Sequence, residues 1–274
     1  MKSLRLSTIG VLTRQDVYYA LRSTRGLLFL VFFGVFWLWV FSKLSGGGAQ
    51  WLANPEGNFI IGWLFDPQIA RSLFVGRSAT LSAFFLLAVS TVPVFVLFAA
   101  SDQTANDIGS KYLRFLTPRC NRLEIYVARF IGAVLLVAGA YLVITVVAAL
   151  MAVFVDQVSF VNVLNDALLI TLSLIIYALP FIALMSLCSV VVGSAGLSAL
   201  VGISVYVVVL LVVAVIGIKM PQVAEAVSYL IPNATKSLVL HLQWSSLLQV
   251  MLMVPLYVLV YGFLGWRIFA NRDI

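Results

Sequence analysis

Long apolar stretches alternate with short polar ones along the whole chain. A helix that crosses a bilayer needs about 20 apolar residues. Six stretches meet or approach this length: 26–42, 78–100, 130–155, 167–192, 197–218 and 246–266. Each is continuously apolar rather than alternating at every second residue, which is typical of membrane helices and not of barrel strands. The pattern predicts an all-α integral membrane fold, with one six-helix transmembrane bundle as a single domain over residues 1–274.

The segment before the first stretch has the pattern of an amphipathic helix. Over residues 4–25, helical spacing gathers one set of apolar side chains on one face: Leu6, Ile9, Val17, Ala20 and Leu21. It gathers a charged set opposite: Arg5, Arg14, Asp16 and Arg22. Such a helix lies along a membrane surface. We therefore expect residues 1–25 to hold a cytosolic interfacial helix; the alternative is a poorly ordered basic tail.

The segment between the fifth and sixth stretches is too polar to span a membrane but still carries apolar clusters. Pro232 separates a cluster around residues 223–231 from another around residues 238–244. The pattern predicts two short helices that dip into the outer interface and cover the bundle as a re-entrant outer segment. The alternative is a loose surface loop.

Composition narrows the class of protein. Hydrophobic residues make up 63% of the chain and charged residues only 10%, whereas a soluble domain is about a quarter charged. The net charge of +7 would suggest a nucleic-acid partner in a soluble protein. Here the basic residues stand at the ends of apolar stretches, where they meet anionic lipid headgroups and set orientation. This disfavours nucleic-acid binding.

The basic residues also predict sidedness. The N-terminal segment, the loop into the third stretch, the turn after the fourth and the C-terminal tail together hold twelve Lys and Arg residues. The other three connections hold five: Lys43, Arg71, Arg77, Lys219 and Lys236. Because the basic side faces the cytosol, both ends of the chain are expected there.

Several kinds of chemistry are missing from the sequence. No Gly-x-x-x-x-Gly-Lys-Ser/Thr pattern is present, so a P-loop is not expected. His241 is the only histidine, and Cys120 and Cys188 are too few for a metal site. The six apolar stretches contain no Asp, Glu, Lys, Arg or His, whereas ion-coupled carriers usually need such a group at depth. We expect neither an enzyme nor a bound cofactor or metal, and an energy source outside the membrane domain.

The loop between the second and third stretches carries the most specific local pattern. It is amphipathic and predicted to be helical from 102 to 116, where Pro118 prevents continuation. Asn121, followed three residues later by Glu124, predicts a capping box for a helix that leads into the third stretch.

This loop resembles that of the type-2 ABC transporter permeases, the membrane subunits of ATP-driven exporters. In that family an acidic residue precedes a glycine, leucines follow, a proline stands nine residues after the glycine, and basic residues lead into the third span. The matching positions here are Asp107, Gly109, Leu113, Leu116, Pro118, Arg122 and Arg129. The order of segments is similar too, over nearly the whole chain, from the basic amphipathic start to the short tail.

The resemblance implies a permease subunit of the cell membrane, in a bacterium the cytoplasmic (inner) membrane. Two such subunits, identical or different, would line the export pathway, and a separate ATP-binding cassette subunit would bind and hydrolyse ATP. The loop would be a coupling helix seated in a groove of that subunit, with Leu113 and Leu116 as apolar anchors. The interface implied is Asp107, Gly109, Leu113, Arg114, Leu116, Arg119 and Arg122. The alternatives are an ion-independent secondary carrier or facilitator and a non-transporting scaffold subunit, and the cargo stays open.

Overall fold

Six helices of the computed structural model are long and apolar enough to cross a membrane, as predicted. The structure describes residues 5–54, 67–229 and 232–272, and no strand occurs among them. The spans are Gly26–Ala53, Ala79–Gly109, Arg122–Phe154, Phe160–Val192, Ala195–Lys219 and Trp244–Asn271. The chain is a multi-pass membrane protein. The predictions for Lys2, for Leu230 and Ile231 in the outer segment, and for the tail beyond residue 272 lie outside the described residues.

The first two spans are built from several helical pieces. The first joins α2 (Thr24–Lys43), a π-helical turn (Leu44–Gly48) and α3 (Ala49–Ala53), and the second joins α6 (Ala79–Ala99), a 3-10 turn (Ala100–Asp102) and α7 (Ala105–Gly109). The others are α9 (Arg122–Phe154), α10 (Phe160–Val192), α11 (Ala195–Lys219) and α14 (Trp244–Asn271). Helix α9 begins earlier than its apolar stretch because the predicted capping box of Asn121 and Glu124 is present and starts the helix there.

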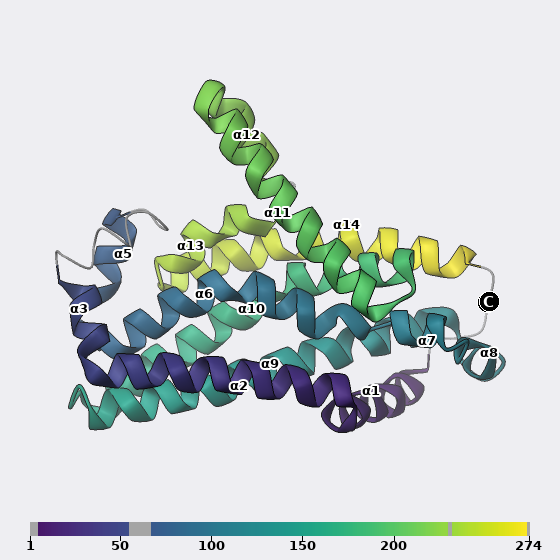
Figure 1. Cartoon of the computed structure of the whole chain (residues 1–274), viewed down its shortest axis with the longest axis horizontal. Helices are drawn as coiled ribbons and strands as arrows, with labels where there is room; N and C mark the ends of the chain where they lie inside the picture. Colours follow the sequence, from purple (N-terminus) through teal and green to yellow (C-terminus); the bar gives the residue numbers. More distant parts are fainter. Residues whose placement is uncertain (1–4, 55–66, 230–231, 273–274) are drawn as a thin grey trace.

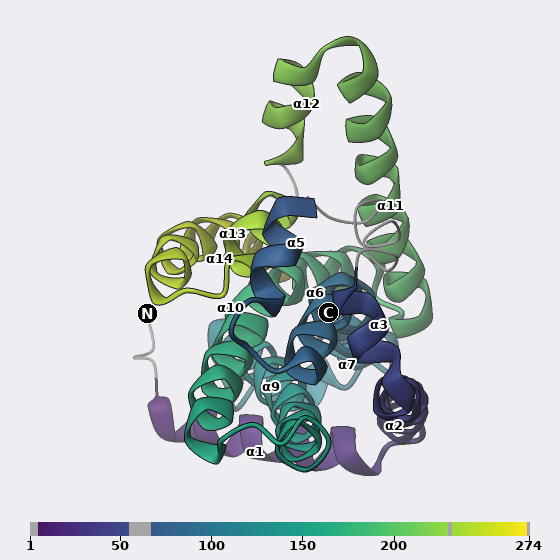
Figure 2. The same cartoon turned by 90° about the vertical axis from the view of Figure 1, so that its left-hand side faces the viewer.

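Helix α1 (Leu6–Arg22) precedes the first span and lies across one end of the bundle (Figure 2). The extended backbone of Ser23 ends α1, and its hydroxyl accepts a hydrogen bond from the Gly26 N–H at 3.0 Å, which caps α2. One face of α1 packs along α9, where the buried Thr13 hydroxyl donates to the Ala128 carbonyl. The helical pattern placed Asp16 with the charged residues opposite the apolar face, whereas in the structure Asp16 lies on the face that packs on α9 and accepts a hydrogen bond from Arg129.

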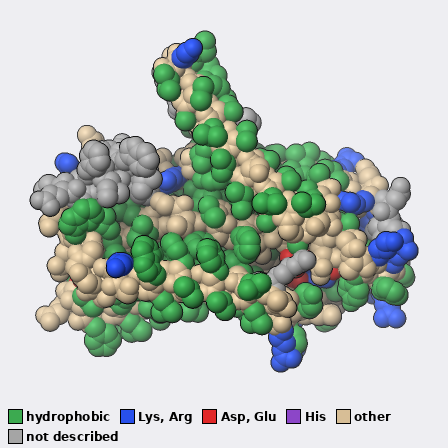
Figure 3. All heavy atoms as spheres, viewed as in Figure 1, with side chains coloured by type: hydrophobic (Ala, Val, Ile, Leu, Met, Phe, Trp, Pro, Cys, Tyr) green, Lys and Arg blue, Asp and Glu red, His purple; other side chains and the backbone are tan. Residues whose placement is uncertain are grey.

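Helices α6 and α10 form the centre of the bundle. In the most apolar part of each of their spans 67% of the residues are buried, against 17% for α11 and for α14. The side chains of Phe84 and Phe85 in α6 and of Phe181 in α10 are fully buried. The remaining spans surround this centre, and apolar side chains cover much of the face drawn in Figure 3. The lipid chains of a bilayer would cover this apolar surface.

One end of the bundle carries α3, α5 (Pro67–Phe74) and α13 (Lys236–Leu240). Helix α13 packs against α14, α5 and α6 and so covers this end. By contrast, α12 (Pro221–Ser228) packs back on α11, and the pair extends away from the bundle (Figures 1 and 2). Of the two short helices predicted between the last two spans, α13 covers the bundle and α12 does not.

The other end gathers α1, the loop 103–121, the turn at 193–194 and the last residues of α14 (Figure 1). These segments were all predicted on the basic side, so the structure confirms that they share one end. We call it the cytosolic end, following the count of basic residues, and the opposite end the outer end. A single helix from 102 to 116 was also predicted; this was wrong, because the chain turns at Lys111 (φ 58°) between α7 and α8 (Leu113–Leu116).

Candidate coupling surface at the cytosolic end

A nearly buried arginine joins three segments at the cytosolic end. Arg129, in α9, donates from Nε to one oxygen of Asp107 at 2.8 Å and from Nη2 to the other at 3.1 Å. Its Nη1 donates to Asp16 of α1. The exposed fractions of the Arg129, Asp107 and Asp16 side chains are only 13%, 9% and 19%. Because bidentate charge-assisted bonds are strong and directional, this charge cluster fixes α1 and α7 against α9.

The charge cluster holds two carboxylates for one guanidinium, and this affects Asp16. Burial raises the pKa of Asp16 from 3.8 to about 6, although Arg129 lowers it and the charges of Asp107 and Asp102 raise it further. Asp16 therefore changes its protonation near neutral pH, so the strength of the link between α1 and α9 depends on pH.

Two more arginines hold the ends of helices together. Arg122 Nη1 donates to the carbonyls of Phe269, Ala270 and Arg272, the last of these at 2.8 Å. Arg272 in turn donates to the carbonyls of Val190 and Val191. These carbonyls lie at helix C-termini, which have no partners within their own helix and carry negative partial charge. Arg122 was predicted at the interface with a partner subunit. In the structure its side chain instead binds the C-terminal end of α14 in the same chain.

The predicted apolar anchor Leu113 also points inward. Its side chain is only 2% exposed and packs in a small cluster with Ile125, Tyr126, Val190 and Phe269. Leu116 is half-buried against the same cluster. Leu113 therefore holds the loop to the bundle, and in this conformation it cannot anchor a partner.

Aromatic side chains that sequence analysis missed occupy the outward face of the loop. Phe115 is 73% exposed and Tyr112 is 40% exposed, and their ring centroids are 6.5 Å apart. Three basic side chains of the same loop are also exposed: Lys111, Arg114 and Arg119. We call these five residues the coupling surface. Of the predicted interface residues, Arg114 and Arg119 lie on it.

Gly109 lies where the loop meets the turn after the fourth span. A Cβ atom at Gly109 would lie 3.0 Å from the Gly193 carbonyl oxygen, and Gly193 itself has a left-handed backbone (φ 70°). A side chain at either position would push the two segments apart, so both glycines permit a close approach. This contact and the Asp107–Arg129 pair seat α7 beneath the bundle.

A signal for the charge cluster was present in the sequence. An arginine that begins an apolar stretch needs a charged or polar partner when it is buried. Asp16 is the only acidic residue in the first 55 positions, and Asp107 lies in the adjoining loop. The outward direction of Tyr112 and Phe115 had no such signal, because it depends on which face of the short α8 meets α9 and α14.

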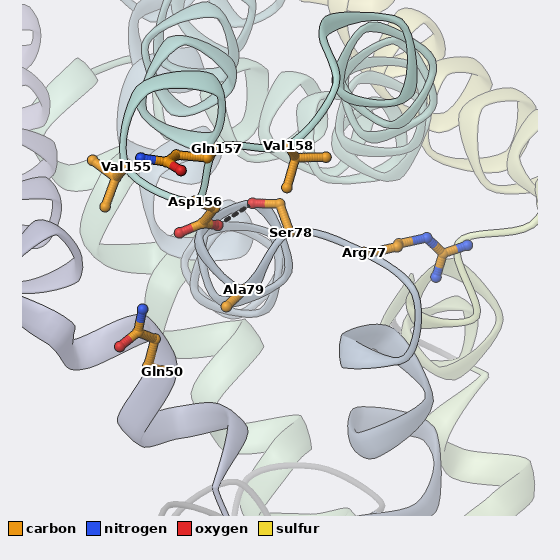
Figure 4. A pocket seen from close by; sticks show the side chains of 8 residues that line it. All are labelled: Gln50, Arg77, Ser78, Ala79, Val155, Asp156, Gln157 and Val158. Atoms are coloured by element: carbon orange, nitrogen blue, oxygen red, sulfur yellow. Dashed lines mark hydrogen bonds between the residues drawn. The ribbon is translucent and has the colours of Figure 1, made fainter.

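The outer end has a polar pocket of about 350 Å³ next to the N-terminus of α6 (Figure 4). Asp156 accepts hydrogen bonds from the Ser78 hydroxyl and from the N–H and hydroxyl of Thr80. Arg77 points away from Asp156 in Figure 4 and donates to the Leu242 carbonyl at 3.0 Å. The carboxylate of Asp156 is thus used as a helix cap, which leaves uncharged amides such as Gln50 and Gln157 on the pocket wall.

The described residues include no group of three or more His, Cys, Asp or Glu that could hold a metal ion. The sequence matches no protein-family model, and the search of curated proteins found no significant match. Function therefore has to be argued from the coupling surface and from the arrangement of the spans.

Proposed function

We propose that the chain is the membrane-spanning permease subunit of an ATP-driven exporter, similar to the type-2 ABC permeases. It pairs with a second permease subunit, and a separate ATP-binding cassette subunit docks at its cytosolic end. It lies in a cell membrane, the cytoplasmic membrane if the source is bacterial, with both ends in the cytosol. The chain itself is not an enzyme, and the partner binds ATP.

The exposed aromatic pair on the coupling surface supports this proposal most directly. Two neighbouring aromatic side chains in a loop that also exposes Lys111, Arg114 and Arg119 have the composition of a protein-binding hot spot, since aromatic residues and arginine carry most interface energy. The complementary partner surface is an apolar groove with an acidic rim. Phe115 is 73% exposed, so burying it in such a groove would be favourable.

The contacts between the coupling surface and the bundle could transmit a displacement of the loop to the spans. Asp107 and Leu113 join the loop to α9 through the charge cluster and the apolar cluster around Phe269. Helix α7 also continues the second span. A displacement of the coupling surface would therefore move α1, α6 and α9 together, since these contacts are short and largely buried. That is what an exporter needs to convert ATP binding in a partner into tilting of its spans.

The test is recovery of the partner in mild detergent. The chain, tagged and purified from its own membrane, should bring down a soluble subunit that contains a P-loop. The double variant Tyr112→Ala/Phe115→Ala should weaken this association by about 30- to 1000-fold, or about 2–4 kcal/mol. The matched control is Phe154→Ala, which removes a phenylalanine of similar exposure (77%) from the outer end of α9 and should retain the partner.

Each result bears on the proposal differently. Recovery without a P-loop subunit would favour a carrier or a scaffold subunit instead. Full retention by the Tyr112→Ala/Phe115→Ala variant would place the partner elsewhere on the chain. Leu113→Ala is unsuitable for this test, because removal of that buried side chain should destabilise the chain itself.

A further inference from the structure

Some polar atoms inside the bundle have no hydrogen-bond partner. Among the described residues, four buried side-chain atoms are in this state: Trp37 Nε1 and the hydroxyls of Tyr141, Tyr177 and Ser198. The Trp37, Tyr141 and Tyr177 side chains are at most 2% exposed. In the hydrocarbon layer no bulk water can satisfy them, so each unpaired group is costly. Phenylalanine in place of either tyrosine would avoid that cost.

Other hydroxyls in the same spans are satisfied. Thr145 donates to the Tyr141 carbonyl at 2.8 Å, and Thr171 donates to the Ala167 carbonyl at 2.8 Å. Tyr126, near the cytosolic end, shares a hydrogen bond with Ser186. These hydroxyls are satisfied inside the bundle, whereas those of Tyr141, Tyr177 and Ser198 are not.

The unpaired aromatic groups lie at a common depth. Tyr141 is near the middle of α9, Tyr177 near the middle of α10, and Trp37 near the middle of the first span. The rings of Tyr177 and Tyr206 both pack against the ring of Phe181, at centroid distances of 5.2 Å and 5.8 Å, and Tyr141 belongs to the same buried cluster. Tyr206 is near the middle of α11, so four helices bring polar aromatic groups to the centre of the membrane.

Helix α11 separates from the bundle next to these tyrosines. At Gly202 it packs so closely that an added Cβ would lie 2.7 Å from the Met185 sulfur atom. Tyr206, 9% exposed, is the last buried residue of α11, and the following Val207 and Val208 are 44% and 55% exposed. Beyond this point α11 runs outward with α12 (Figure 1). A small outward rotation of α11 would therefore separate Tyr206 from Phe181 of α10, the ring that also packs against Tyr177.

The types of side chain around these tyrosines indicate which class of ligand could bind there. Phenol hydroxyls and an indole N–H donate hydrogen bonds, and the surrounding rings of Phe33, Phe95 and Phe181 are apolar. The predicted apolar stretches that carry these residues have no charged side chain, so a charged ligand would lack a counter-charge. The match is an uncharged molecule, mostly apolar, with acceptor oxygens such as those of esters.

We propose that Tyr141, Tyr177 and Tyr206 form a mid-membrane binding site for an uncharged, lipid-like molecule bearing acceptor oxygens, reached when α11 rotates away from α10. As a statement about cargo it rests on the proposed export function. As a binding site it stands on the unpaired hydroxyls of Tyr141 and Tyr177 and on the contact of Tyr206 in α11 with Phe181 in α10.

A photoactivatable diacylglycerol tests the site on the purified full chain, together with any partner that co-purifies, in nanodiscs of zwitterionic lipid. It should label peptides of α10 and α11 near Tyr177 and Tyr206. Tyr141→Phe/Tyr177→Phe should reduce this labelling about tenfold, which corresponds to two modest hydrogen bonds. The control Tyr257→Phe removes a hydroxyl that donates to the Tyr229 carbonyl on the outer side and should leave labelling within about twofold. The phosphorylated analogue, a photoactivatable phosphatidic acid, should label these peptides at least about tenfold less.

Thermal unfolding of the same variants in detergent separates a binding role from a structural one. Tyr141→Phe/Tyr177→Phe should melt at the same or a higher temperature than the parent chain, because it removes unpaired groups. Tyr126→Phe should melt lower, because it leaves Ser186 unpaired. A lower melting temperature for the Tyr141→Phe/Tyr177→Phe variant, unchanged labelling in it, or equal labelling by phosphatidic acid would overturn the site. Failure to recover a P-loop subunit would instead overturn the exporter proposal and leave these outcomes intact.

Discussion

At the cytosolic end, one nearly buried arginine and two carboxylates join α1, α7 and α9, whereas at the outer end α12 packs back on α11 and the outer half of α11 is largely exposed. The cytosolic segments also exchange hydrogen bonds from arginine side chains to helix C-termini. The outer half of α11 has no such ties: Leu211, Val215 and Ile218 are 59%, 65% and 84% exposed. Regions with few buried contacts rearrange at low cost. The comparison indicates a rigid cytosolic end and an outer end where packing can change.

Removal of Arg129 should have the largest effect on this comparison. Arg129→Met leaves Asp16 and Asp107 as uncompensated buried carboxylates, which should cost about 3–5 kcal/mol in the free energy of unfolding. The measurement is unfolding of the detergent-solubilised chain by heat and by denaturing detergent. Arg267→Met, which removes an exposed arginine of α14, should change stability by less than about 0.5 kcal/mol.

A rescue variant makes the Arg129 prediction specific to charge. Adding Asp16→Asn and Asp107→Asn to Arg129→Met removes the unpaired charges, so most of the lost stability should return. If Arg129→Met were as stable as Arg267→Met, the rigid cytosolic end would have another cause.

Asp156 tests the outer end, where the expected effect is smaller. Asp156→Ala removes the carboxylate that accepts hydrogen bonds from Ser78 and Thr80 at the start of α6, and should cost about 1–2 kcal/mol. Asp166→Ala breaks only a partly exposed pair with Arg77 at 3.6 Å, and should cost less than about 1 kcal/mol. Thermal unfolding in detergent ranks the two. If Asp156→Ala lowered the free energy of unfolding as much as Arg129→Met does, the two ends would not differ in rigidity as this comparison expects.

The pH dependence of Asp16 should be the smallest effect. Its pKa is raised from 3.8 to about 6 in the folded chain, so the folded state binds the proton more tightly than the unfolded state does. The resulting stabilisation is present below pH 3.8 and is lost as the pH rises through about 6. The stability difference between the parent chain and Asp16→Asn should therefore decline across that window and be constant above it.

The measurement is the melting temperature of both chains at matched ionic strength between about pH 4 and 7.5. The titrating groups that do not interact with Asp16 are common to both chains, so their contributions cancel in the difference. A difference that grows with pH would show that the attraction of Arg129 outweighs the burial of Asp16.

The candidate site could be predicted only in part. Its position in the loop before the third span followed from the order of apolar and basic residues, and Arg114 and Arg119 were placed correctly on an exposed surface. The pattern could not assign side-chain directions within so short an element. The resemblance implied that Leu113 is an anchor for a partner, while the structure buries it against Phe269. A four-residue helix has no stable face of its own, so its neighbours decide which side chains are covered.

The sequence by itself determined the number of spans, the grouping of their connections at two ends, and the start of α9 at Asn121. These depend on apolar length, on basic residues beside it and on hydrogen bonds within one helical turn, all of which are local. Only the tertiary structure decided that Asp16, 113 residues away, meets Arg129, and that α11 leaves the bundle beside Tyr206. The physical reason is that helix rotation and crossing are set by packing between distant segments, where side-chain shape rather than local pattern determines the contact.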